Sequence, residues 1–132
     1  MDINCQILVA EHVEFDPTIK KHSIYNIHNK IEVPTFPSAI VTQVYFKYTF
    51  KEDLDSDNII CHIKIFEPSK EIIYEAILPE LINFRDSKMK PGIDGVVELR
   101  LPVYMEGNYE YAIYANEKKL CSYPVYIEKN LI

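Results

Sequence analysis

The chain has 132 residues, 48% of them hydrophobic, which predicts one folded domain over residues 1–132 and argues against disorder. Its 20 acidic and 14 basic side chains give a formal net charge of −6, and no cluster of lysine or arginine stands out. An acidic surface repels phosphate groups, so we expect neither nucleic acid nor an anionic membrane as a partner.

The cysteine content indicates a reducing environment. Cys5, Cys61 and Cys121 lie far apart in the sequence, and none of them belongs to a C-x-x-C pair. Secreted domains seldom leave one thiol over, so we expect a cytoplasmic location. The first apolar run, residues 7–10, ends at Glu11 and is too short for a signal peptide or a membrane span.

Alternation of apolar and polar residues, rich in β-branched and aromatic types, is the main pattern along the chain. The first expected strands cover residues 3–15 and 23–27. The clearest strand follows over residues 40–50, where one face is apolar and the other carries polar side chains. Five further strands are expected over residues 59–65, 72–78, 97–101, 109–115 and 120–127.

Turn-forming residues separate these strands. Residues 34–38 contain two prolines and oppose helix formation, and residues 53–58 are expected to form a loop. A turn is expected at residues 67–70, and a tight hairpin follows Asn116, which tolerates a left-handed backbone. The one helical turn or two that we expect lies over residues 79–85.

Eight short strands with a turn every ~8–12 residues are typical of a β-sandwich. The sequence therefore predicts an all-β fold, an immunoglobulin-like antiparallel sandwich of seven to nine strands with Greek-key connections. Gly107 stands two residues before the strand residue Tyr109, a spacing similar to that of a tyrosine corner. We expect Tyr109 to have a structural role there.

Glycine is too scarce for a nucleotide-binding loop. Such loops need several glycines so that backbone amides can approach a phosphate group, and neither the G-x-G-x-x-G nor the G-x-x-x-x-G-K pattern is present. We expect no nucleotide and no other cofactor. The three glycines are Gly92, Gly95 and Gly107.

One acidic loop could bind a cation. Asp53, Asp55 and Asp57 alternate along residues 52–57, and calcium-binding sandwiches of the C2 type place aspartates on loops in a similar way. The spacing does not match an EF-hand, and no second acidic loop is evident. We prefer a solvated loop without a metal, and a C2-like, calcium-dependent ligand-binding domain is the alternative function.

Candidate catalytic residues are not arranged in a recognisable motif. Zinc sites commonly take two ligands from one short motif, and none of the four histidines belongs to such a motif. In a regular strand Cys61 points inward and His62 points outward, so they cannot form a catalytic pair. We expect no enzymatic activity, and a hydrolase that uses Cys61 or a histidine cluster is the remaining catalytic hypothesis. The histidines are His12, His22, His28 and His62.

Ten of the 132 residues are tyrosine, and several fall on faces that we assign to the outside. Tyrosine is enriched in binding surfaces, although partial covering of both sheet faces would also explain its number. The interface candidates are Tyr45, Tyr114 and Tyr123. They favour a non-enzymatic interaction or structural module, whose partner is another protein or a second copy of the chain.

Several short motifs occur in an order that resembles a family of small uncharacterised bacterial β-sandwich proteins, a domain of unknown function. They include residues 21–27 (KHSIYNI), the Phe36–Pro37 connector, the long strand over 41–50 and the segment 107–111 (GNYEY). The resemblance covers most of the chain and implies an immunoglobulin-like sandwich. It implies no catalytic residues. The family often has glycine where this chain has Asn26, and both residue types tolerate a positive φ.

Overall fold

A computed structural model describes residues 3–131, and within that range it contains nine strands and one short 3-10 turn, Ser56–Asn58. No helix in this part of the chain is long and apolar enough to cross a membrane. The strands are β1 Ile3–Asp16, β2 Lys21–Ile27, β3 Lys30–Val33, β4 Ser38–Phe50, β5 Cys61–Phe66, β6 Ile72–Ile77, β7 Gly92–Val103, β8 Gly107–Ala115 and β9 Lys118–Lys129.

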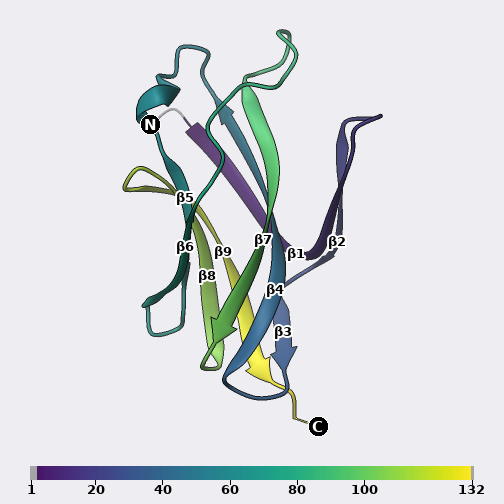
Figure 1. The fold of residues 1–132 in the computed structure, drawn as a ribbon, viewed down its shortest axis with the longest axis vertical. Coiled ribbons are helices and arrows are strands. Elements are labelled where there is room, and N and C mark those ends of the chain that lie inside the picture. Colours follow the sequence, from purple (N-terminus) through teal and green to yellow (C-terminus); the bar gives the residue numbers. More distant parts are fainter. Residues whose placement is uncertain (1–2, 132) are drawn as a thin grey trace.

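The strands form two sheets that pack face to face (Figure 1). One sheet has the order β2-β1-β4-β7, and the other has the order β3-β9-β8-β5-β6. All paired strands are antiparallel except β3 and β9, which are parallel. The chain crosses between the sheets after β2, β3, β4, β6 and β7. This arrangement is an immunoglobulin-like β-sandwich and confirms the fold class predicted from the sequence.

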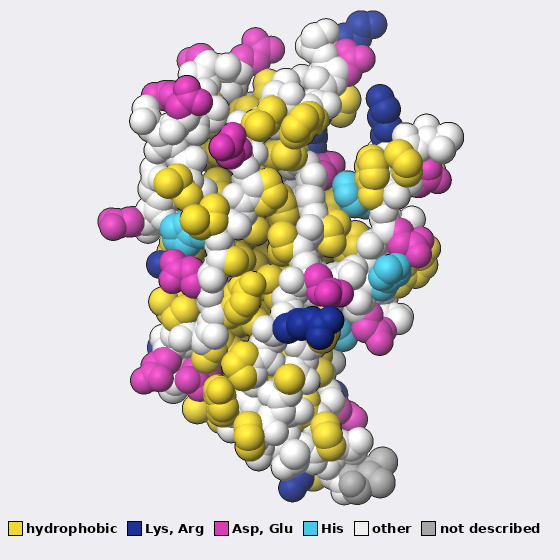
Figure 2. Space-filling view, in the orientation of Figure 1, with side chains coloured by type: hydrophobic (Ala, Val, Ile, Leu, Met, Phe, Trp, Pro, Cys, Tyr) yellow, Lys and Arg dark blue, Asp and Glu magenta, His cyan; other side chains and the backbone are white. Residues whose placement is uncertain are grey.

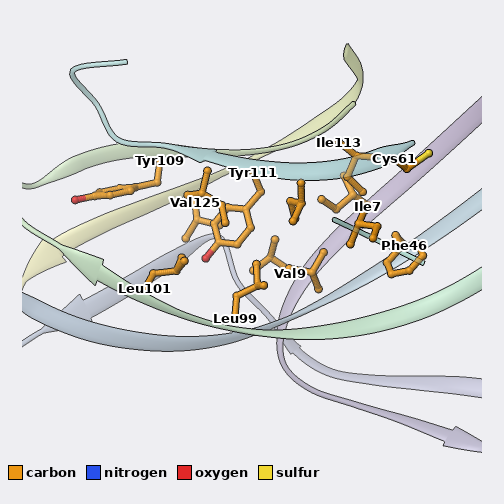
Figure 3. Close-up of a cluster of buried hydrophobic side chains, with 14 of the residues drawn as sticks. Ile7, Val9, Phe46, Cys61, Leu99, Leu101, Tyr109, Tyr111, Ile113 and Val125 are labelled. Atoms are coloured by element: carbon orange, nitrogen blue, oxygen red, sulfur yellow. The ribbon is translucent and has the colours of Figure 1, made fainter. Parts of the chain in front are cut away.

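The core lies between the sheets and follows from the alternation in each strand (Figure 3). In β4, Val44, Phe46 and Tyr48 are fully or almost fully buried, whereas the residues between them are half-buried on the outer face. Successive strand residues point to opposite sides, so this pattern commits one face of β4 to the interior. Tyr111 on β8 and Val125 on β9 meet that face from the opposite sheet.

The β1–β2 hairpin extends beyond the sandwich. From Ile3 to Ala10, β1 pairs with β4, but beyond Ala10 it pairs with β2 alone. In Figure 1 the hairpin leaves the body of the domain and ends in a separate tip. Phe15 and Ile19 near this tip are more than half exposed.

Three parts of the fold differ from the sequence prediction. Strand β3, Lys30–Val33, was not expected, and β7 begins at Gly92 rather than at residue 97. The helical turn predicted over residues 79–85 is wrong, because this segment is an irregular connection. It contains Pro79 and links two strands that lie in different sheets. Backbone amides here bond to side chains instead of to a neighbouring strand, as those of Arg85 and Gly92 do to Asn83.

Candidate interaction surface

Tyr45 lies on the outer face of β4, where the β1–β2 hairpin contacts the sheet. The His22 ring meets the Tyr45 ring edge-on at a centroid distance of 5.0 Å, and Phe15 lies against His22 at 4.8 Å. Burial raises the pKa of the Tyr45 phenol, and the nearby Asp94 carboxylate raises it further. Tyr45 therefore anchors the hairpin to the sheet and offers only part of its ring to a partner.

Tyr114 lies on the outer face of the other sheet. The His62 ring stacks on it with a centroid distance of 5.7 Å and an interplanar angle of 7°. The Lys64 ammonium sits 4.7 Å from the centre of the same ring, which is a cation–π contact. Ile77 stands opposite His62 on the neighbouring strand β6 and is 78% exposed. Tyr114, His62 and Ile77 thus form one outward-facing row across three strands, in which Ile77 is exposed and the two rings are half-buried.

The outward orientation expected for Tyr123 is wrong. Tyr123 is partly buried against the core, on the same face of β9 as Cys121 and Val125. Its hydroxyl donates a hydrogen bond of 2.8 Å to the carbonyl of His28. The three candidate tyrosines therefore do not form one surface, and Tyr123 instead ties β9 to the connection between β2 and β3.

Tyr109 is bonded to the loop that precedes its own strand. Its hydroxyl donates to the carbonyl of Met105 at 2.7 Å and accepts from the amide of the same residue at 3.3 Å. Gly107 has a φ of 142°, and a Cβ there would collide with the ring of Pro68. These contacts hold the crossover from β7 to β8 in the manner of a tyrosine corner.

The acidic loop does not assemble a cation site. Asp55 accepts a hydrogen bond of 2.6 Å from the side-chain amide of Asn58, which spans the short 3-10 turn. Across residues 3–131, no group of three or more His, Cys, Asp or Glu side chains is placed to hold a metal ion. Asp53, Asp55 and Asp57 are therefore not gathered around one point, and the calcium-binding alternative is not favoured.

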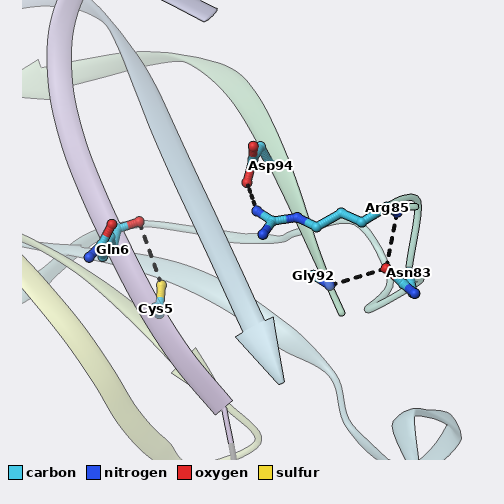
Figure 4. A network of polar contacts seen from close by, with 6 residues as sticks. All are labelled: Cys5, Gln6, Asn83, Arg85, Gly92 and Asp94. Carbon is cyan, nitrogen blue, oxygen red and sulfur yellow. Dashed lines mark hydrogen bonds and ion pairs between the residues drawn. The ribbon is translucent and has the colours of Figure 1, made fainter. Parts of the chain in front are cut away.

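The free edge of β7 is a feature that sequence reasoning missed. Both backbone groups of Gly92 point away from β4. Its amide donates to Asn83 Oδ1 at 3.2 Å (Figure 4), and its carbonyl accepts from the Phe84 amide at 3.4 Å. The register of β7 with β4 is unbroken as far as Val103, so every second residue repeats this orientation. The outward amides belong to Asp94, Val96, Glu98 and Arg100.

These outward amides have no partner strand. Within residues 3–131, β7 pairs with β4 only, and β7 is the last strand of its sheet. The next outward position is Pro102, which has no amide hydrogen, as is common at a sheet edge. The Arg85 guanidinium binds the Asp94 carboxylate at 2.8 Å and covers only the start of the strand (Figure 4). The central part of the edge is therefore open.

Beside this edge the core is incompletely covered. Tyr74 and Ala76 on β6, with Ile93 and Val97 on β7, are half-buried and pack against the core. Figure 2 shows hydrophobic side chains in a band between β6 and β7, with acidic side chains along the margin nearer β6. An additional strand next to β7 would cover this band, since alternate side chains of an edge strand face the sandwich interior.

A cleft of about 300 Å³ opens where β6 ends and the chain crosses toward β7. Ile60, Ile77 and Ile82 line it, and each of them is at least 47% exposed. Asp57 and Glu80 also line the cleft, so apolar contact and negative charge occur together. The sequence carried a signal for this surface, because alternation places Ile77 on the outer face of its strand together with Glu75.

Comparison with known proteins gives a fold neighbour but no family. No family model and no curated protein matches this chain. Among solved structures, an immunoglobulin-like protein from Pseudomonas aeruginosa is similar, with a TM-score of 0.47 and 8% sequence identity. The alignment covers 96% of this chain and 97% of that protein.

Proposed function

We propose that this protein is a non-enzymatic binding module that adds an extended segment of a partner protein to the free edge of β7. The observation that carries the proposal is the row of outward amides on β7 beside a half-covered apolar band. In strand addition, backbone hydrogen bonds supply affinity, and alternate side chains of the added strand supply specificity. Both requirements are met along the same strand.

The exposed groups indicate the chemistry of the partner segment. Side chains that point inward from the added strand would pack on Tyr74 and Ala76, so apolar residues are required at every second position. The cleft lined by Asp57 and Glu80 favours lysine or arginine at the end of the segment that reaches it. The net charge of −6 favours a basic partner as well.

A non-enzymatic role is supported by the separation of the candidate catalytic groups. Cys61 is buried on the inner face of β5, and burial raises the pKa of its thiol, which disfavours the nucleophilic thiolate. His62 lies on the outer face of the same strand, stacked on Tyr114. The proposal therefore assigns these residues to the core and to the outer surface.

The experiment that tests the proposal begins with photo-crosslinking in the source organism. A photoreactive amino acid replaces Glu98, beside the free edge, and the matched control carries it at Lys118, the first residue of β9. We expect crosslinks from position 98, but not from position 118, to a segment with alternating apolar residues and a basic end. A synthetic peptide with that sequence is then titrated calorimetrically into the purified protein.

Two substitutions at Val96 test the role of the backbone. Val96→Pro removes an outward amide, whereas Val96→Ala keeps the amide and shortens the side chain. We expect the proline variant to bind the peptide ~10-fold or more weakly, which corresponds to about 1.4 kcal/mol, and the alanine variant to bind almost normally. Thermal unfolding confirms that both variants are folded. Equal binding by the two variants, or crosslinks from position 98 to a second copy alone, would overturn the proposal.

A further inference from the structure

Two cysteines from opposite sheets meet at one end of the sandwich. The sulfur atoms of Cys5 on β1 and Cys121 on β9 lie 2.9 Å apart and share a hydrogen bond, although 116 positions separate the residues in sequence. Both residues are free thiols and both are partly exposed. The pairing joins strands of different sheets, which the alternation pattern alone does not reveal.

We propose that Cys5 and Cys121 form a reversible disulfide that joins the two sheets when the protein encounters a disulfide oxidant such as oxidised glutathione. A disulfide bond is about 2.05 Å long, so the two sulfur atoms need to approach by a little under 1 Å. Small rotations of the two side chains supply that movement. No rearrangement of β1 or β9 is required, because these strands already pack against each other.

The surroundings favour Cys121 as the attacking thiolate. The hydrogen bond shared with Cys5 lowers the pKa of Cys121, and a backbone contact with Ile113 and the positive charge of Lys119 act in the same direction. Burial opposes them. The same hydrogen bond raises the pKa of Cys5, so Cys5 keeps its proton when Cys121 loses its own.

The reaction is an ordinary thiol–disulfide exchange in two steps. The Cys121 thiolate attacks oxidised glutathione, forms a mixed disulfide and releases one glutathione thiolate. Cys5 then loses its proton and attacks the Cys121 sulfur, which forms the protein disulfide and releases the second glutathione. The two cysteine thiols lose two electrons and two protons in total, and oxidised glutathione is reduced to two thiols. A reducing dithiol reverses both steps.

The third thiol provides an internal control. Cys61 is buried in the core near the hydroxyl of Tyr48, and burial raises the pKa of its thiol. No sulfur atom lies within hydrogen-bonding distance of Cys61 among the contacts of residues 3–131. Oxidation is therefore expected to consume two of the three thiols and to leave Cys61 reduced.

The test uses the full chain, equilibrated with oxidised glutathione and then unfolded and alkylated. We expect the intact mass to fall by two hydrogen atoms, one cysteine instead of three to be alkylated, and peptide mapping to place the disulfide between Cys5 and Cys121. Thermal unfolding should shift to higher temperature and return to its starting value after reduction, because a crosslink restricts the unfolded chain.

Single variants separate this pair from other pairings. Cys5→Ala and Cys121→Ala should form no intramolecular disulfide, whereas Cys61→Ala should form it as the natural chain does. Where Cys61→Ala is too unstable to purify, the peptide map of the natural chain decides the same question. A disulfide that includes Cys61, a stable glutathione adduct in place of the internal bond, or three free thiols at equilibrium would each overturn the proposal.

Discussion

The side-chain oxygens of Thr42 on β4 and Tyr111 on β8 lie 2.9 Å apart across the core, and each of these residues is fully buried. Burial raises the pKa of Tyr111 to about 12, although Thr42 lowers it in part, so the phenol remains protonated near neutral pH. The pair therefore satisfies two polar groups inside the core. It also links the two sheets near the middle of the long strand β4.

Removing one hydroxyl of this pair should lower the free energy of unfolding more than removing both. Thr42→Val leaves the Tyr111 hydroxyl without a partner in the core, and we expect a loss of about 1–3 kcal/mol in the free energy of unfolding. The double variant Thr42→Val/Tyr111→Phe should recover much of that loss. Urea denaturation of both single variants and the double variant measures the coupling. Additive effects of the two substitutions would contradict this assignment.

The corner formed by Tyr109 should contribute measurably to stability. Tyr109→Phe removes the hydrogen bonds to Met105, and we expect a loss of about 1 kcal/mol in the free energy of unfolding. Tyr104→Phe is the matched control, because Tyr104 is 56% exposed and lies in the same crossover. Urea denaturation compares the two variants. An equal response to both changes would show that the corner bond has no stabilising role.

Gly95 should be intolerant of a side chain because the ring of Phe46 lies against it. A Cβ at Gly95 would collide with the Cζ atom of that ring. We expect Gly95→Ala to destabilise the fold by about 1–3 kcal/mol, the usual range for overpacking a core. Adding Phe46→Leu shortens the opposing side chain and should reduce the cost of the alanine. If Gly95→Ala is as stable as the natural chain, the Phe46 ring does not lie as close to the Gly95 backbone as described.

His28 should make stability depend on pH below neutrality. Burial lowers the pKa of His28 below its ordinary value of 6.5, although Glu11 acts in the opposite direction. As the pH falls below 6.5, the unfolded chain protonates His28 before the folded chain does. The folded state therefore loses stability as the pH falls from 6.5 to the lower pKa of His28 in the folded state.

The variant His28→Gln isolates this contribution. Stability is measured at about pH 7.5 and about pH 5 for the natural chain and the variant. We expect the natural chain to lose more stability between these two pH values than the variant loses. The difference should be small, because the side chain is partly solvated. A steeper loss in the variant would contradict the direction of the pKa shift.

The alternation of apolar residues predicted most strands because one face of each is buried. It worked best for β4, whose buried and half-buried residues alternate from Thr42 to Phe50. It failed for Lys30–Val33, since four residues are too few to show a period and their partner β9 lies far along the chain. It also failed at the start of β7, where Gly92 and Gly95 interrupt the pattern although both residues are paired with β4.

The candidate surface was harder to predict than the fold. Tyr45 and Tyr114 do lie on outer faces, but their contacts with His22 and His62 depend on strand pairings that the sequence does not show. Tyr123 was misplaced because β9 carries apolar residues on both faces, so alternation could not select the inner one. The free edge of β7 depends on which strands end each sheet, and that is a property of topology rather than of local sequence.

Amide hydrogen exchange on β7, followed by NMR, tests the proposed strand addition most directly. In the free protein, the amides of Val97, Leu99 and Leu101 should be protected by β4, and those of Val96, Glu98 and Arg100 should exchange rapidly. Addition of the partner peptide identified by crosslinking should protect the second set and leave the first unchanged. Rapid exchange of Val96, Glu98 and Arg100 in the saturated complex would contradict strand addition at this edge.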